Sequence, residues 1–146
     1  MKLPLYFPIL FMILSFSQKE QNETNLAIEI HVSKIEEQQI VLRNFTYEDI
    51  ARYTMATIMG QPSKTIKVRK KDNLYFVSYI RKSDNQKFDY KIKFSGNKIM
   101  WANFDGRWRN SKYDEKITFE EKGDKIRIIQ TFDDNSTDIQ VFKKGD

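Results

Sequence analysis

The chain has 146 residues and a formal net charge of +5, and it contains no cysteine and a single histidine. The length suits one ordinary domain with its own core, and the absence of cysteine excludes disulfides, cysteine-ligated metals and thiol catalysis. The 25 basic and 20 acidic residues are interspersed along the chain, as on a solvated surface, so we expect no nucleic-acid binding.

The first 17 residues have the organisation of a secretory signal peptide. Lys2 supplies one positive charge, and residues 3–16 are almost wholly apolar. Ser15 and Ser17 place small residues at the two key positions of a cleavage site, and a polar stretch follows directly. The apolar run is shorter than the about 20 residues that a membrane span needs. We therefore expect export to the periplasm or the cell exterior, without a membrane span after cleavage; the alternative is an uncleaved N-terminal membrane anchor.

We therefore divide the chain into a signal peptide at residues 1–17, a flexible leader at residues 18–24 and a single α+β domain at residues 25–146. The domain begins with Leu26–Val32, where apolar and polar residues alternate as in a half-buried strand. The short apolar run of residues 40–42 either pairs as a strand or leads into the next element.

That next element is a helix from about Tyr47 to Met59. Thr46 is a natural N-cap, and Asp49 stands three residues later, at the spacing of a capping box. Gly60 suits the left-handed position that ends a helix. Apolar residues recur at helical spacing along one side, so the helix should lay one face on a sheet. These residues are Tyr47, Ile50, Ala51, Met55, Ile58 and Met59.

From Lys64 to the C-terminus, apolar residues recur with a period of two, which indicates β-strands. The segment from Leu74 to Ile80 is aromatic and β-branched almost throughout, which suggests burial on both faces. Clusters of turn-forming residues separate the strands at short intervals, as in an antiparallel meander. The expected strands outside a central hairpin are Thr65–Arg69, Leu74–Ile80, Phe88–Phe94, Lys116–Glu120, Lys125–Phe132 and Asp138–Lys143.

These elements predict the α+β class, with one helix in the N-terminal half packed on a curved antiparallel meander of about six to eight strands. A sheet of this length must curl, so we expect a curved sheet or a partly open barrel with the helix across its concave face. Without disulfides, the stability of this fold must come from packing.

The dipeptide Asp105-Gly106 favours the two-residue turn of a β-hairpin. A tight turn there fixes which residues face each other across the two strands. Alternation then places Trp101 and Trp108 together on one face of the hairpin. Two arginines project from the opposite face, and they are Arg107 and Arg109.

The candidate binding site is the group Trp101, Arg107, Trp108 and Arg109. Exposed tryptophans on a sheet can stack on sugar rings or anchor partner proteins, and arginines add planar hydrogen-bond donors. The competing interpretation is that both rings fill the core between helix and sheet, as large rings usually do. We favour burial of both rings, and these four residues form the binding site if the face is exposed.

No residue pattern indicates a catalytic or metal site. One histidine, His31, without any cysteine cannot form a multi-histidine zinc site. The run Asp133–Asp138 fails the EF-hand pattern, which needs a glycine and a glutamate at set positions. Carboxylates are available near the central hairpin, at Asp105, Asp114 and Glu115, but glycoside hydrolysis needs two of them held at a set separation. We assign no catalytic residue, no metal and no cofactor.

The sequence therefore predicts a small exported domain, more consistent with a non-enzymatic binding or accessory role than with catalysis. Its partner would be a protein, a glycan or a small ligand, and nothing in the sequence specifies an oligomeric state. Two alternatives belong to other classes. One is a histidine-independent hydrolase that uses carboxylates on the sheet, and the other is a calycin-like carrier with an apolar cavity.

Overall fold

Among residues 39–146, which a computed structural model describes, one α-helix precedes a seven-stranded sheet. The expected signal peptide, the leader, the strand Leu26–Val32 and His31 lie outside the described residues and stay predictions. In residues 39–146, no helix is long and apolar enough to cross a membrane.

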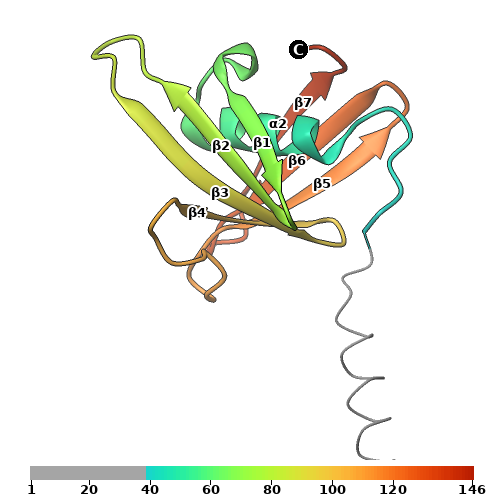
Figure 1. Ribbon diagram of the computed structural model, residues 1–146. Helices are drawn as coiled ribbons and strands as arrows, with labels where there is room; N and C mark the ends of the chain where they lie inside the picture. Colours follow the sequence, from blue (N-terminus) through green and yellow to red (C-terminus); the bar gives the residue numbers. More distant parts are fainter. Residues whose placement is uncertain (1–38) are drawn as a thin grey trace, which may run out of the picture. The chain divides into compact units, whose positions relative to one another are not determined.

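The helix comes first and the strands follow it as a continuous series (Figure 1). Helix α2 spans Tyr47–Met59, and the short 3-10 helix η1 spans Ser63–Thr65. The strands are β1 (Lys67–Lys71), β2 (Leu74–Ile80), β3 (Lys87–Ser95), β4 (Lys98–Asn103), β5 (Lys116–Lys122), β6 (Lys125–Thr131) and β7 (Thr137–Lys143).

The sheet is an antiparallel meander, because each strand pairs with its neighbours in the chain and the spatial order is β1 to β7. Strands β1 and β7 form its two edges, and the sheet does not close into a barrel. The predicted class and architecture, one helix on a curved antiparallel meander, are confirmed (Figure 1).

The ends of α2 are those that the sequence predicts. The Thr46 side chain accepts a hydrogen bond from the backbone of Asp49 at 3.2 Å, and the Asp49 carboxylate accepts one from the backbone of Thr46 at 2.9 Å. This reciprocal pair is a capping box. Gly60 ends the helix with φ 59°, and its N–H donates to the carbonyl of Ala56.

Helix α2 lies across the concave side of the sheet (Figure 1). We call this side the inner face and the opposite side the outer face. The inner face forms the core, with fully buried residues of the helix such as Ile50 and Met55 against aromatic and β-branched side chains of the strands. The sheet residues of this core are Tyr75, Val77, Tyr79, Tyr90, Ile92, Phe94, Ile99, Trp101, Ile117, Phe119, Ile126 and Ile128.

Strand β2 has the predicted bounds but is not buried on both faces. Tyr75, Val77 and Tyr79 are buried on the inner face, whereas Phe76 is half-buried on the outer face and Ile80 is 56% exposed. The expectation of two buried faces is therefore wrong, because the helix covers only one side of the sheet.

Residues 40–42 form neither a strand nor a helix, and they lead into α2 as irregular chain. The Tyr47 hydroxyl donates a hydrogen bond to the carbonyl of Ile40 at 3.0 Å. The segment that follows is tied to β5, since the Glu121 carboxylate accepts hydrogen bonds from three successive backbone N–H groups. These are the N–H groups of Arg43, Asn44 and Phe45.

The predicted hairpin around Asp105-Gly106 does not form. Neither residue has the positive φ that a type I′ turn requires, and Gly106 instead donates to the carbonyl of Asn103 at 2.9 Å in a single tight turn. Strand β4 pairs with β3 on one side and with β5 on the other, and residues 104–115 form a long loop before β5, to which β4 pairs through only two residue pairs. A side chain at Gly106 would approach Asn103 Cβ to 3.0 Å, so close approach explains this glycine.

Candidate functional site

Trp101 is a core residue of β4. Its side chain is 5% exposed on the inner face, and the edge of its ring meets Tyr90 with 5.7 Å between the ring centres. The indole N–H donates to a Glu115 carboxylate oxygen at 2.9 Å, and the Arg109 guanidinium lies 4.2 Å from the centre of the ring. The polar edge of the indole is therefore satisfied, as a buried tryptophan requires.

Trp108 lies in the loop between β4 and β5, beside the outer face of β3. The ammonium groups of Lys91 and Lys93 lie 5.2 and 4.7 Å from the centre of its ring. These two lysines alternate with the buried Ile92, so their side chains leave the sheet on the outer side. Trp108 itself is only half-buried.

The side chain of Arg107 links the two halves of the loop formed by residues 104–115. Its guanidinium forms a two-point ion pair with Asp114 at 2.8 and 2.9 Å, and the backbone N–H of Ser111 donates to the same carboxylate at 2.9 Å. The hydrogen bonds from Arg107 and Ser111 hold the pKa of Asp114 well below its usual range. Arg107 is exposed whereas Asp114 is buried, so the pair anchors a surface residue to the base of the loop.

The structure thus separates the two tryptophans, and the prediction that they share a face is wrong. One ring belongs to the inner face and the other lies against the outer face, because residues 104–115 fold back over the sheet instead of continuing β4. Of the four predicted site residues, only Trp108 belongs to the basic outer surface described below. The other members of that surface were not predicted from the sequence. The remaining three, Trp101, Arg107 and Arg109, form the stack and the ion pair described above.

The outer face of β1 to β4 is strongly basic. The strand register places seven basic side chains and one acidic side chain, Asp89, on this face. The outer face of β5 to β7 has five basic side chains and one acidic one, Glu120, which pairs with Arg127 and Lys122. The seven basic residues of β1 to β4 are Lys67, Arg69, Lys71, Lys87, Lys91, Lys93 and Lys98.

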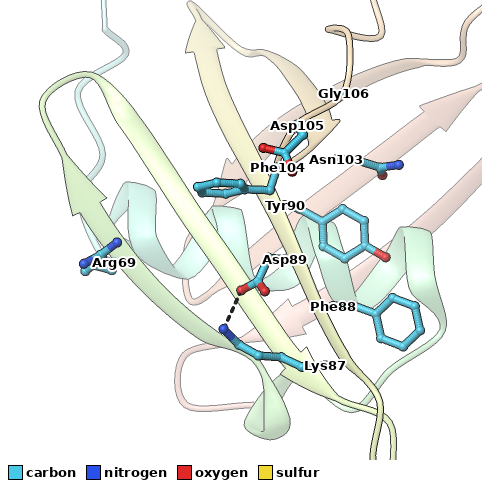
Figure 2. Close-up of a pocket in the computed structure, with 9 residues that line it drawn as sticks. All are labelled: Arg69, Lys87, Phe88, Asp89, Tyr90, Asn103, Phe104, Asp105 and Gly106. Atoms are coloured by element: carbon cyan, nitrogen blue, oxygen red, sulfur yellow. Dashed lines mark ion pairs between the residues drawn. The ribbon is translucent and has the colours of Figure 1, made fainter.

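The basic half of the outer face is hollowed where β4 ends. Two adjoining hollows of about 890 and 370 Å³ have five residues in common in their walls, Arg69, Lys87, Asp89, Tyr90 and Phe104. Figure 2 shows the larger of the two, with Lys87 and Asp89 joined by an ion pair. Their nitrogen and oxygen atoms are 2.9 Å apart. The smaller hollow is lined by three basic side chains and one acidic one, a balance that favours an anionic ligand, whereas the larger hollow is lined by two of each.

Aromatic rings accompany these charges. Phe104 is 51% exposed and packs against Phe76 with 5.8 Å between ring centres, and the Arg69 guanidinium lies 5.8 Å from the Phe76 ring. Together with Trp108, these residues form what we call the basic-aromatic surface. Its members are Lys67, Arg69, Phe76, Lys87, Lys91, Lys93, Phe104 and Trp108.

The carboxylates that a hydrolase would need are engaged in other contacts. Asp114 is held by Arg107, and Glu115 accepts the hydrogen bond of the Trp101 indole. Asp105 is exposed at the rim of the larger hollow. Asp89 lines the same hollow, and its carboxylate is paired with the Lys87 ammonium at 2.9 Å.

The space that a calycin-like carrier would use for an apolar ligand is occupied by the protein itself. Helix α2 and the aromatic side chains of the strands fill the concave side, and Tyr53 and Met55 are fully buried there. The inner face is accordingly a packed core.

Among residues 39–146, no group of three or more histidine or carboxylate side chains is placed to hold a metal ion. Residues 132–136 connect β6 to β7, so the first four residues of the run Asp133–Asp138 lie in this connection and its last two begin β7. Asn135 has a positive φ of 64° there, and Asp134 accepts hydrogen bonds from Ser136. This run is a hairpin turn, as its composition indicates.

A scan against protein-family models, a search of curated proteins and a search of solved structures find no match to this chain. Function is therefore argued from the geometry of the site.

Proposed function

We propose that this protein is an exported, non-enzymatic binding domain whose basic-aromatic surface binds an acidic glycan. The observation that carries the proposal is that the five basic side chains and three aromatic rings of this surface gather on the outer face of β1 to β4, where Lys67, Arg69, Lys87 and Phe104 line two hollows. Export rests on the N-terminal sequence pattern alone.

The charge of the surface determines the sign of the ligand. Lys91 and Lys93 are two residues apart on β3, and the register places them on the same face as Lys67 and Arg69 of β1, with β2 between the two strands. Such an array attracts carboxylate or sulfate groups and binds them through charge-assisted hydrogen bonds. Exposed aromatic carbon at Phe104 adds apolar contact for the carbon face of a sugar ring.

A glycan fits this surface better than a nucleic acid does. Proteins that bind single-stranded nucleic acids stack the bases on free aromatic faces. Here cations already lie over the rings of Phe76 and Trp108, so these faces are not free to receive a base. The surface would therefore bind a ligand mainly through its charged groups, with apolar contact as a smaller contribution.

The proposal is tested by binding of a fluorescent sulfated oligosaccharide to the wild-type protein and to the double variant Lys91→Gln/Lys93→Gln. Loss of two charge-assisted contacts should weaken binding by about tenfold or more, since each contact contributes about 1.5 kcal/mol or more. Binding by the wild-type protein should also weaken as salt is added.

The matched control is Lys116→Gln/Lys125→Gln, which removes two lysines from the outer face of β5 and β6. This variant should bind nearly as tightly as the wild-type protein. Equal losses in both variants would mean that net charge alone attracts the ligand. A single-stranded oligonucleotide that binds more tightly than the oligosaccharide would contradict the proposed ligand class.

A further inference from the structure

Strand β7 leaves one edge of the sheet open within the described residues. It pairs with β6 on one side, and it is the last strand in the order of the sheet. Residues 137–141 are all exposed. An open edge of this kind presents unpaired backbone N–H and C=O groups that can pair with another strand.

The register identifies which residues carry these free groups. Phe132 donates to Ser136 across the turn, so that pair is hydrogen-bonded. Hydrogen-bonded and non-bonded pairs alternate along an antiparallel ladder, so Asp138 and Gln140 direct their backbone groups to β6. The N–H and C=O groups of Thr137, Ile139 and Val141 therefore point away from the sheet.

The residues with outward backbone groups also carry exposed apolar side chains. Ile139 is 41% exposed and Val141 is 53% exposed, and both side chains lie on the outer face beside Ile129 and Arg127 of β6. Exposed apolar residues along an open edge favour addition of a further strand.

The opposite edge of the sheet is protected. Strand β1 has the sequence Lys-Val-Arg-Lys-Lys, and two copies of it would bring like charges together. Lysine-rich edge strands are a common protection against edge-to-edge association. Strand β7 lacks this protection, since Asp138 and the terminal Lys143 are its only charged residues.

We propose that β7 pairs antiparallel with β7 of a second copy of this chain, about a two-fold axis at Ile139. Each Ile139 then faces the Ile139 of the other copy, and Thr137 faces Val141. The two sheets become continuous, and the apolar residues of both edges form one stripe on the shared outer face. This contact is self-complementary, so it closes as a dimer and does not extend into a fibre.

Charge complementarity supports this register. With Ile139 on the axis, Asp138 faces the uncharged Gln140 of the second copy. Further out, the turn that contains Asp133 and Asp134 approaches Lys143 and Lys144 at the far end of the second β7. Opposite charges therefore meet at both ends of the paired segment, and the register places no like charges across it.

The first test is the mass of the purified protein by sedimentation equilibrium. The wild-type protein should be dimeric at about 100 μM, as expected for a small interface. Ile139→Lys places two ammonium groups face to face across the axis and should weaken the dimer by about tenfold or more. The control Ile80→Lys changes an exposed isoleucine on β2, 56% exposed against 41% for Ile139, and should leave the dimer intact.

The absence of cysteine allows a second test, by disulfide cross-linking. The Cα atoms of a hydrogen-bonded pair are about 5.5 Å apart, within the range that a disulfide spans. Ile139→Cys should therefore form a disulfide-linked dimer about tenfold or more faster than Ile80→Cys, because pairing raises the local concentration of the thiols. A wild-type protein that is monomeric at about 100 μM, or equal cross-linking in both variants, would overturn the proposal.

Discussion

Trp101 and Trp108 are seven positions apart in the sequence, and the sheet lies between their rings. The first ring is buried and has its N–H satisfied by Glu115, whereas the second is half-buried with lysines over its face. Two residues of the same type therefore differ in what they contribute, the first to stability and the second to a charged surface.

Replacement of each tryptophan by alanine should separate these contributions. Trp101→Ala removes a large ring from the core and should lower the free energy of unfolding by about 3–5 kcal/mol. Trp108→Ala removes a half-exposed ring and should change it by no more than about 1 kcal/mol. Urea denaturation measures both values. Losses of similar size would show that Trp108 is as much a core residue as Trp101.

The ion pair between Arg107 and Asp114 makes stability depend on pH. The pKa of Asp114 is lowered in the folded protein, chiefly by the hydrogen bonds from Arg107. The unfolded chain therefore takes up a proton first as the pH falls. The stabilisation is fully present above the unfolded pKa of 3.8 and is lost as the pH falls from there through the folded value.

The variant Asp114→Asn should remove this dependence. Its urea midpoint at neutral pH should be lower than that of the wild-type protein, and the difference should shrink between about pH 5 and pH 2. Asp133→Asn, which removes one negative charge from an exposed turn, is the control. Its urea midpoint should follow that of the wild-type protein as the pH falls. A wild-type midpoint that falls no faster with acid than that of Asp114→Asn would contradict the structural role of the pair.

The sequence predicted the bounds of most strands and of the helix, because alternation and capping act between residues that are close in the chain. The period of two identified β2, β3 and β5 to β7 to within a few residues, and the capping residues identified both ends of α2. The prediction of a hairpin at Asp105-Gly106 is wrong because this dipeptide also fits a turn with negative φ values. The ion pair of Arg107 with Asp114 and the two-residue pairing of β4 with β5 then decide the path of the loop.

Part of the basic-aromatic surface is visible in the sequence as basic residues that alternate along two strands. Lys91 and Lys93 alternate with buried residues on β3, and Lys67 and Arg69 flank the half-buried Val68 on β1. Each pair by itself is typical of a solvated strand face. That the pairs lie on the same face follows only from the register, and that Phe104 and Trp108 join them follows only from the fold of the loop.

The capping box of α2 can be tested by substitution. Thr46→Ala removes the acceptor for the Asp49 N–H and should lower the free energy of unfolding by about 0.5–2 kcal/mol. Thr46→Ser keeps the hydroxyl and should retain most of the stability. A denaturation midpoint that is the same for alanine and serine would show that the hydroxyl does not cap the helix in solution.

For the whole molecule, the N-terminal pattern predicts processing on export. Cleavage after Ser17 should yield a mature chain that begins at Gln18, because small residues precede that bond after an apolar run. Intact-mass measurement of the exported protein gives the answer directly. A membrane-bound form that keeps residues 1–17 would support the alternative of an uncleaved anchor.

The central claim is that the outer face of β1 to β4 binds an anionic ligand, and a nuclear magnetic resonance titration tests it most directly. The ¹⁵N-labelled protein has two indole N–H signals, one for each tryptophan. A sulfated oligosaccharide should shift the Trp108 indole and the amides of Lys91 and Lys93, while the buried Trp101 indole and the amides of β6 and β7 stay in place. Shifts spread evenly over both halves of the outer face, or none at saturating ligand, would contradict the account.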